Sequence, residues 1–560
     1  MERYSYDLGR KHSVYSLARS TRLLGLTALT AAMLFAGCGT SDGGDAGTGG
    51  SAGTGGMAGA GGTGGMGGAA GSGGIGGMAG SGGSAGSGGV GGVGGGAMCE
   101  SALDCDDDNE CTNDSCNPVN QTCDNAPVED GTVCDADGLP GTCEAGLCAA
   151  EPQWGEAEQI SPEAAADAII PRVASDAEGN AIVVWQQTDN AGTRHVWARH
   201  FTPSNGWASA QRISNGESDV NQPRVAVDAA GNGIVVWYQF ERKVTDLLTI
   251  HNIWAIRYTP SSGWGTPEVI EDNAGNADSA EVATNSDGIQ MVVWRQHPDG
   301  NGYTDIWGRK YDPSQGWDIP RAVEVNAENS SQARPAVDEN GDAIAVWVQM
   351  RDIWTGRYTP MNGWGTSEPL TDSGTGANGP VVAVDTSGNA TAVWSRTGCS
   401  TTCNAWAARY THGGSWADPE PINGQGESAN GFDLAFDIAG MAMVLWNQSG
   451  NIWNNRYSPQ TGWGSAALVE QSQAHAGQPS FEFDADGNAT AVWHESEGAD
   501  YSVEAASFTP SGGWEVSERI DGGAVQLGAP NVAVDPEGKA TAVWYEYDGL
   551  KSSVWANRYE

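Results

Sequence analysis

The chain has 560 residues, of which 70 are acidic and 27 basic, and its formal net charge is -43 at pH 7. A field this negative repels phosphates, so the composition excludes nucleic acid as a partner and disfavours an anionic membrane surface. The acidic residues are dispersed along the chain, as expected for surface carboxylates that keep a protein soluble rather than for one acidic site.

Residues 1–38 have the composition of an export signal. Five basic residues precede an apolar core from Leu23 to Phe35, which is too short to cross a bilayer as a helix. The core ends in the letters LFAGC, which resemble the lipoprotein box of exported bacterial proteins, with Cys38 as the last residue. The resemblance implies that Cys38 becomes the mature N-terminus and carries a lipid anchor in a bacterial membrane, which we expect to be the outer one. Ordinary secretion after cleavage nearby is the alternative, and either way the chain leaves the cytoplasm.

Residues 39–98 are predicted to form a flexible linker. Gly, Ser, Ala, Thr and Met dominate them, and no charged residue follows Asp45 within this range. Such a segment cannot bury enough apolar surface to fold. A coil of this length spans on the order of 40 Å, which is enough to hold a domain clear of a membrane.

Residues 99–150 are predicted to form a disulfide-rich module. The run CESALDCDDDNECTNDSCNPVNQTC, followed by DGTVCDADGLPGTCEAGLC, resembles small cysteine modules of exported bacterial surface proteins. So short a segment cannot build an adequate core, so disulfides must stabilise it, and its eight cysteines permit about 105 pairings among which the spacing does not choose. The disulfide candidates in this module are Cys99, Cys105, Cys111, Cys116, Cys123, Cys134, Cys143 and Cys148.

Three acidic residues of this module, Asp104, Asp106 and Asp108, could present oxygens to calcium, the one cofactor that the sequence suggests. There is no glycine turn followed by a glutamate at calcium-loop spacing, so a solvated acidic loop is the alternative. Zinc is disfavoured because the thiols of an exported chain are better explained as disulfides.

From Trp154 onward, the chain repeats one unit eight times, with a period of 47 to 57 residues. Each unit reads as four short strands with turn residues between them, and no helical period competes. A tight Asp-x-x-Gly-Asn turn joins the first two strands, and a Gly-Trp turn precedes the fourth. This pattern predicts an all-β fold, an eight-bladed β-propeller over residues 154–560. Two smaller stacked arrays are the alternative. The second strand of each unit ends in a tryptophan: Trp185, Trp237, Trp294, Trp347, Trp394, Trp446, Trp493 and Trp544.

The phase of the repeat predicts how the ring closes. The chain stops after a third strand, at Trp555 to Glu560, and the missing fourth strand is found at the other end, in Trp154 to Ile160. We therefore expect the N-terminal strand to complete the last blade and leave no open edge.

The phase also separates two faces of the propeller. The turns between strands 1 and 2 and between strands 3 and 4 are short, whereas the other loops vary in length. The loop between Trp237 and Trp254 is the longest and carries Arg242, Lys243 and His251, which we predict to contact a ligand. Another such loop carries Cys399 and Cys403, which are placed to form a local disulfide.

Repetition itself favours structural roles. An arginine recurs in the third strand of seven units, and a residue present in nearly every blade more often packs or forms an ion pair than binds a ligand. These arginines are Arg199, Arg257, Arg309, Arg357, Arg409, Arg456 and Arg558.

Two propeller families are similar to this chain. The Gly-Trp turn resembles the Asp-box of sialidases, without the aspartate of that box. The order of a strand Trp, an Ile-Trp and a Gly-Trp is similar to fucose-binding propeller lectins, whose pattern places Gln187 and Gln239 as ligand contacts. The lectins' sugar-clamping Arg and Glu have no equivalents here, so the resemblance implies the fold more than the sugar site.

The sequence shows no metal-binding histidine spacing, no phosphate-binding loop and no nucleophile–base pair, so we expect a protein that is not an enzyme. The leading hypothesis is a lipid-anchored binding or scaffold protein, displayed at the cell surface or in the periplasm, whose propeller face takes a protein or glycan ligand. The alternatives are a multivalent carbohydrate-binding lectin and a sialidase-like enzyme that cleaves glycans.

Overall fold

The computed structural model describes residue 99 and residues 101–560, except 108, 118, 137–138, 163–166, 217, 243–248, 273–274, 298–301, 325–327, 375, 397–403, 424–427, 471, 499 and 524–525. Cys38, Cys399 and Cys403 lie outside these residues, so the lipid anchor and the loop disulfide stay predictions. Within the described part of the chain, no helix is both long and apolar enough to cross a membrane.

The cysteine-rich module contains one short 3-10 helix and two small sheets. The helix η1 is Ala102–Asp104, β1 (Thr112–Asn117) pairs with β2 (Thr122–Pro127), and β4 (Leu139–Glu144) lies between β3 (Val133–Ala136) and β5 (Leu147–Ala150). All eight cysteines are paired, as predicted, and the core of the module consists largely of the disulfides themselves. The bonds are Cys99–Cys116, Cys105–Cys123, Cys111–Cys143 and Cys134–Cys148.

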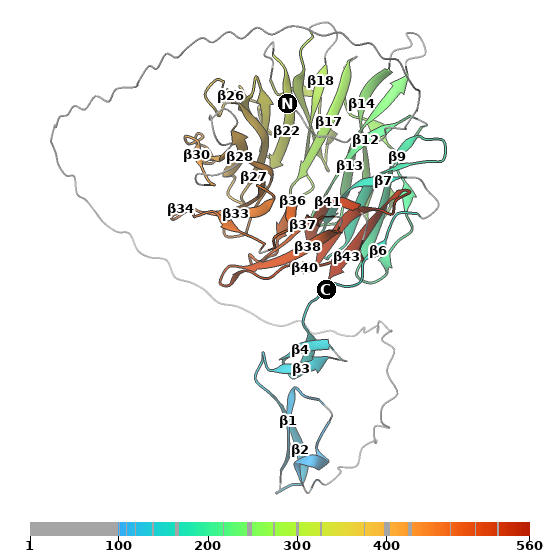
Figure 1. Cartoon of the computed structure of the whole chain (residues 1–560), viewed down its shortest axis with the longest axis vertical. Coiled ribbons are helices and arrows are strands. Elements are labelled where there is room, and N and C mark those ends of the chain that lie inside the picture. Colours follow the sequence, from blue (N-terminus) through green and yellow to red (C-terminus); the bar gives the residue numbers. More distant parts are fainter. Residues whose placement is uncertain are drawn as a thin grey trace, which may run out of the picture. The chain divides into compact units, whose positions relative to one another are not determined.

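Eight antiparallel sheets follow and form the blades of a propeller, numbered here in chain order from β7 (Figure 1). The innermost strands are β7 (Ala168–Ser175), β12 (Val220–Val227), β17 (Asn276–Thr284), β22 (Ser330–Val337), β27 (Ala377–Val384), β31 (Ala429–Phe436), β36 (His475–Phe483) and β41 (Gln526–Val534). The second strands are β8 (Ala181–Thr188), β13 (Gly233–Arg242), β18 (Gln290–His297), β23 (Ala343–Gln349), β28 (Ala390–Arg396), β32 (Ala442–Gln448), β37 (Ala489–Glu497) and β42 (Ala540–Tyr547).

The outer half of each blade holds a third strand and shorter edge strands. The third strands are β9 (Arg194–Thr202), β14 (Thr249–Thr259), β19 (Asp305–Asp312), β24 (Asp352–Thr359), β29 (Asn404–Tyr410), β33 (Asn451–Ser458), β38 (Asp500–Thr509) and β43 (Ser552–Tyr559). The Gly-Trp strands are β10 (Gly206–Trp207), β15 (Gly263–Trp264), β20 (Gly316–Trp317), β25 (Gly363–Trp364), β34 (Gly462–Trp463) and β39 (Gly513–Trp514). The fourth strands are β6 (Glu158–Gln159), β11 (Gln211–Arg212), β16 (Glu268–Val269), β21 (Arg321–Ala322), β26 (Glu368–Pro369), β30 (Glu420–Pro421), β35 (Ala467–Leu468) and β40 (Glu518–Arg519).

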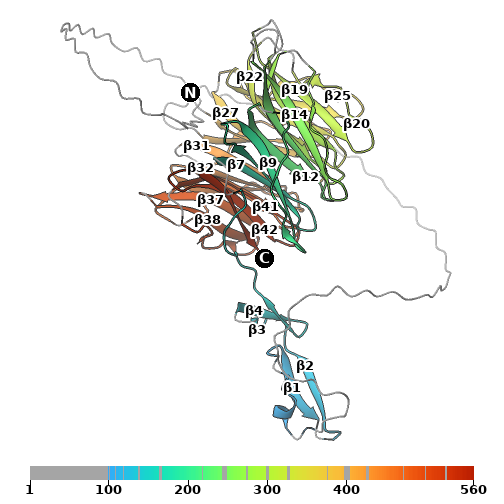
Figure 2. The ribbon, with the colours of Figure 1, turned by 90° about the vertical axis from the view of Figure 1, so that its right-hand side faces the viewer.

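The ring closes as the phase of the repeat predicted. Each innermost strand contacts that of the next blade, and β41 of blade 8 contacts β7 of blade 1. Strand β6 pairs with β43, with Gln159 opposite Trp555 and Glu158 opposite Ala556, so the N-terminal strand completes blade 8. Figure 2 shows β7, β9 and β12 of the adjoining blades 1 and 2 side by side. The all-β fold and the eight-bladed propeller are confirmed.

Every innermost strand carries a bulge at the same place, where its register with the second strand shifts. The residue in the bulge has a positive φ in all eight blades, and in only two of them is it a glycine. These residues are Ile170, Gln222, Ser279, Gln332, Gly379, Gly431, Gln478 and Ala529.

Side chains of one blade satisfy the free inner edge of the next blade, where backbone N–H groups would otherwise lack a partner. For example, Gln332 Oε1 accepts a hydrogen bond from the Gly379 N–H at 2.9 Å, and Gln478 Oε1 accepts one from the Ala529 N–H at 2.9 Å. Hydrogen bonds of this kind therefore join the innermost strands of adjacent blades.

The strand tryptophans form the centres of the blade cores. All eight are 0% exposed and pack between adjacent blades. In six blades the indole N–H donates to the Gln or Glu side chain two residues further on, which satisfies a polar group that would be costly to leave unpaired in an apolar core.

The recurrent arginines join neighbouring blades, as the repetition predicted. Arg257 lies over the Tyr311 ring of the next blade, with its guanidinium carbon 4.0 Å from the ring centre. Arg309 donates to the Ile270 carbonyl of the preceding blade at 2.8 Å. These side chains are structural cross-links between blades.

Candidate functional site

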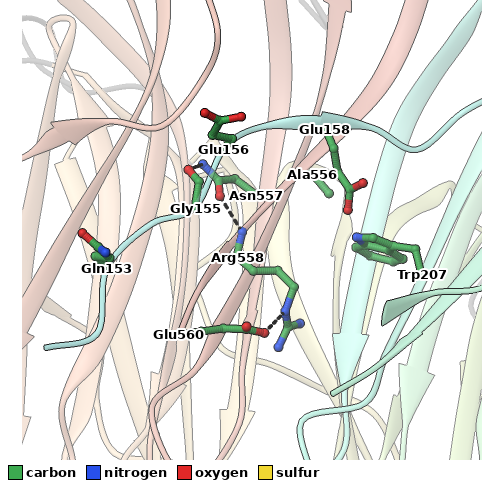
Figure 3. A pocket seen from close by; sticks show the side chains of 9 residues that line it. All are labelled: Gln153, Gly155, Glu156, Glu158, Trp207, Ala556, Asn557, Arg558 and Glu560. Carbon is green, nitrogen blue, oxygen red and sulfur yellow. Dashed lines mark hydrogen bonds and ion pairs between the residues drawn. The ribbon is translucent and has the colours of Figure 1, made fainter. Parts of the chain in front are cut away.

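A cavity of about 280 Å³ lies at the outer edge of the propeller, where blade 8 meets blade 1. The lining residues come from the N-terminal strand, from β43 and from β10 (Figure 3). They are Gln153, Gly155, Glu156, Glu158, Trp207, Ala556, Asn557, Arg558 and Glu560. We call this cavity the closure groove, because it follows the junction that closes the ring.

Trp207 forms one wall of the closure groove. The turn before it needs Gly206, whose φ is +67°, and β10 then pairs with β9. One edge of the indole packs against Phe201, with ring centres 5.3 Å apart, while the residue as a whole stays half-buried. The ring is therefore fixed in place but keeps part of its surface open to solvent.

The N-terminal strand adds carboxylates to the groove. Glu156 and Glu158 are exposed, and Figure 3 shows the Glu158 carboxylate beside the Trp207 indole. The backbone that carries them is held by Asn557, whose Nδ2 donates to the Gly155 carbonyl at 2.9 Å. Arg199 lies over the Trp207 ring, with its guanidinium carbon 5.7 Å from the ring centre. Burial lowers the pKa of Arg199, and the negative charge of Glu158 opposes that change.

Arg558 also lines the groove. Its guanidinium carbon lies 3.7 Å from the centre of the Phe201 ring of blade 1, and Nε pairs with Glu560 at 2.5 Å. Because these contacts fix the guanidinium, it holds the two blades together and adds a positive charge beside the carboxylates.

One equivalent boundary of the ring is closed by a hydrogen bond. Between blades 2 and 3, Trp317 Nε1 donates to Glu268 Oε1 at 2.8 Å, so the tryptophan and the carboxylate satisfy each other. Among the described residues, no such bond joins Trp207 and Glu158. An open aromatic face beside free carboxylates is suited to a ligand that has an apolar ring face and several hydroxyl groups.

The structure corrects the expectation for Gln187 and Gln239. They are 1% and 4% exposed, and each Oε1 accepts a hydrogen bond from a strand tryptophan, Trp185 at 2.8 Å and Trp237 at 3.2 Å. Both amide groups are therefore buried in the core and hydrogen-bonded there, and neither faces a ligand at the surface.

The predicted contacts of the long loop are only partly described. His251 lies in β14, half-buried, with its ring 4.3 Å from that of Phe240 and 5.7 Å from that of Tyr238, and burial lowers its pKa. Arg242 ends β13, but its side chain and all of Lys243 lie outside the described residues. Their role in binding stays a prediction.

The acidic residues of the cysteine module are not seen to converge on one point. Asp104 Oδ2 accepts hydrogen bonds from the Ser101 N–H at 2.8 Å and its hydroxyl at 3.2 Å, which caps the helix η1. Asp106 is exposed, and Asp108 lies outside the described residues. Calcium binding there stays a prediction.

The closure groove was not predicted from the sequence. The variable loops were expected to hold the site, whereas Trp207, Glu156 and Glu158 belong to a repeated turn and to the closing strand. The available signal was the phase of the repeat, which already placed Trp154–Ile160 beside the end of the chain.

No family model and no curated protein matches the chain. Among solved structures, it is similar to a protein of unknown function from Dyadobacter fermentans, with 10% identity over 73% of this chain and 99% of that one, at a TM-score of 0.38. It is also similar to a family 25 polysaccharide lyase, an ulvan lyase, with 9% identity over 71% and 95% of the chains, at 0.40. A third is the leech intramolecular trans-sialidase, with 11% identity over 73% and 70%, at 0.33.

These likenesses concern the fold and identify no residue or substrate. They nevertheless correct one expectation of the sequence analysis, namely that the chain is not an enzyme. Two of the three structures just named are enzymes, a lyase and a trans-sialidase. We therefore withdraw the prediction of a non-catalytic protein.

Proposed function

We propose that this chain is an exported, lipid-anchored protein whose propeller recognises neutral glycans in the closure groove. The observation that carries the proposal is the cavity of about 280 Å³ that is lined by the half-exposed Trp207 ring and the Glu156 and Glu158 carboxylates. This volume is close to the lower end of the range for small-molecule sites, roughly 300–1,000 Å³, and suits one or two sugar rings.

A sugar has both an apolar face and hydroxyl groups, which match the indole and the carboxylates of the groove. The C–H face of a pyranose packs on an indole face, and its hydroxyl groups donate hydrogen bonds to carboxylates, which are strong acceptors. Asn557 and the Arg558–Glu560 pair hold the walls in place before any ligand arrives, so little ordering is needed on binding.

The charge of the groove selects among glycans. The lining residues include Glu156, Glu158 and Glu560 but one arginine, Arg558, and the whole chain carries a formal net charge of -43. Sialylated, sulfated or uronic-acid glycans would be repelled, whereas neutral hexoses and deoxyhexoses would not.

A glycan array probed with the purified full chain tests this proposal. We expect binding to neutral glycans, and a loss of roughly tenfold or more in Trp207→Ala, because the stacking platform is removed. Trp364→Ala is the matched control, since Trp364 occupies the same repeat position but follows a blade with Arg321 in place of the glutamate. The proposal would be refuted if the folded chain bound no glycan on the array, or if Trp207→Ala bound as well as the native chain.

The lipid anchor has a separate test. In a bacterial host, the native chain should sediment with membranes, and Cys38→Ala should be found in the soluble or secreted fraction. Cys399→Ala is the control, because it removes a cysteine without touching the signal. Equal sedimentation of the native chain and Cys38→Ala would contradict anchoring through Cys38.

A further inference from the structure

The boundary between blades 4 and 5 departs from the repeat at two positions that meet in space. In blades 1, 2, 5 and 7 the Asp-x-x-Gly-Asn turn ends in an asparagine whose Nδ2 donates to Oδ2 of the leading aspartate, at 2.7 to 2.9 Å. In blade 4 the leading residue is Asp338 and the last is Asp342, so the donor is replaced by a second carboxylate.

This replacement removes the amide donor that Oδ2 has in those four blades. Asp338 is 4% exposed, and its Oδ1 accepts the N–H groups of Asn340 and Asp342, both at 2.9 Å. Within the described part of the chain, Oδ2 has no hydrogen-bond donor. Two facing carboxylates without a shared cation are costly.

The second departure supplies an imidazole at the same point. Between blades 1 and 2, a Cβ placed on Gly231 would lie 2.6 Å from Asp176 Oδ2 and 3.1 Å from Cγ of Pro260, the proline of the Thr-Pro turn. Between blades 4 and 5, the equivalent Cβ on Gly388 would lie 2.8 Å from Asp338 Oδ2, and its closest neighbour would be Nδ1 of His412. His412 therefore stands where the other blade presents a proline.

The three ligand atoms, one each from Asp338, Asp342 and His412, lie within 4.8 Å of one another. The space among them is about 10 Å³, close to the volume that one water-sized species needs. Arg357 lines the same space, and its guanidinium carbon lies 4.4 Å from the centre of the Tyr410 ring. Among the described residues, Arg357 forms no ion pair with either aspartate.

We propose that Asp338, Asp342 and His412 bind one divalent transition-metal cation of the zinc type, which cross-links blades 4 and 5. Two carboxylates and an imidazole suit zinc, whereas calcium prefers an all-oxygen set. A water would complete a tetrahedral site.

The test is a zinc titration of the chelator-washed full chain by calorimetry, with bound metal counted by elemental analysis. We expect one tight equivalent and a rise in Tm with zinc, because a ligand that binds only the folded state stabilises it. Asp342→Asn and His412→Pro restore the residues of the other blades, so both should fold. Each should weaken zinc binding at least tenfold and abolish the zinc-dependent rise in Tm.

Asn232→Asp is the matched control. It places a second carboxylate beside Asp228 but leaves Pro260 in place of the histidine, so it should gain no zinc equivalent. The proposal is overturned if the native chain binds no stoichiometric zinc, or if Asp342→Asn and His412→Pro bind it as the native chain does.

Discussion

The strand tryptophans and the turn tryptophans recur in the same repeat, yet their surroundings differ. The strand residues, such as Trp237, are fully buried, and six of the eight donate their indole N–H to a side chain two residues further on. The turn residues, such as Trp207, pack one edge on a Tyr or Phe of their own blade and remain half-exposed. The difference shows that repetition alone does not reveal function. What matters is which copy of a repeated side chain still has an open face and free polar neighbours.

The largest effect should follow the loss of a strand tryptophan. Trp237→Ala should destabilise the chain by about 3–5 kcal/mol, because it leaves a cavity in the core between blades 1 and 2. Trp264→Ala, in the turn of the same blade, should cost about 1 kcal/mol through its lost packing on Tyr258. Chemical denaturation monitored by circular dichroism measures both. Equal losses would contradict the contrast between the two sets.

The hydrogen bond of a strand tryptophan should matter next. Gln239→Leu leaves the buried Trp237 N–H without an acceptor, and we expect a cost of about 1–3 kcal/mol. Gln349→Leu is the control, since Trp347 Nε1 and Gln349 Oε1 already lack partners in blade 4. The same denaturation experiment should show a smaller loss there, and a reversed order would contradict the role assigned to the glutamine.

The smallest effect concerns blade 8, where a glutamate replaces that glutamine. Trp544 donates to Glu546 Oε1 at 2.8 Å, and burial raises the pKa of this carboxyl. Since the folded chain holds the proton more tightly than the unfolded chain, the contribution of Glu546 to stability is complete below the pKa of the unfolded chain. It is lost as the pH rises through the folded pKa.

Glu546→Gln should therefore raise Tm at pH 8, by on the order of 1 °C because the side chain is only partly buried, and should change it little at pH 4. Thermal melts at the two pH values check this. Glu518→Gln, on the exposed outer strand β40, is the control, and it should show no such pH-dependent gain.

Much of the fold could be predicted from the sequence, because the fold depends on features that recur. The tryptophan period gave the number of blades, and the missing last strand predicted the pairing of β6 with β43. The glutamines were misjudged because the sequence shows that Gln187 follows Trp185 by two residues, but not that its side chain turns back to the indole N–H in the core.

The closure groove and the blade 4–5 cluster could not be predicted in the same way. Both depend on which side chains of adjacent blades meet, and this is set by packing across a boundary rather than by spacing within a unit. A residue-by-residue comparison of the repeats would have flagged Asp342 and His412, but not that they converge.

Diffraction from crystals of the full chain, soaked with the neutral sugar that binds best on the array, would show whether the closure groove holds the ligand. We expect density for a sugar ring on the exposed face of Trp207, with hydroxyl groups within hydrogen-bond distance of Glu156 or Glu158. Density only among the loops of the variable face, with an empty closure groove, would contradict it.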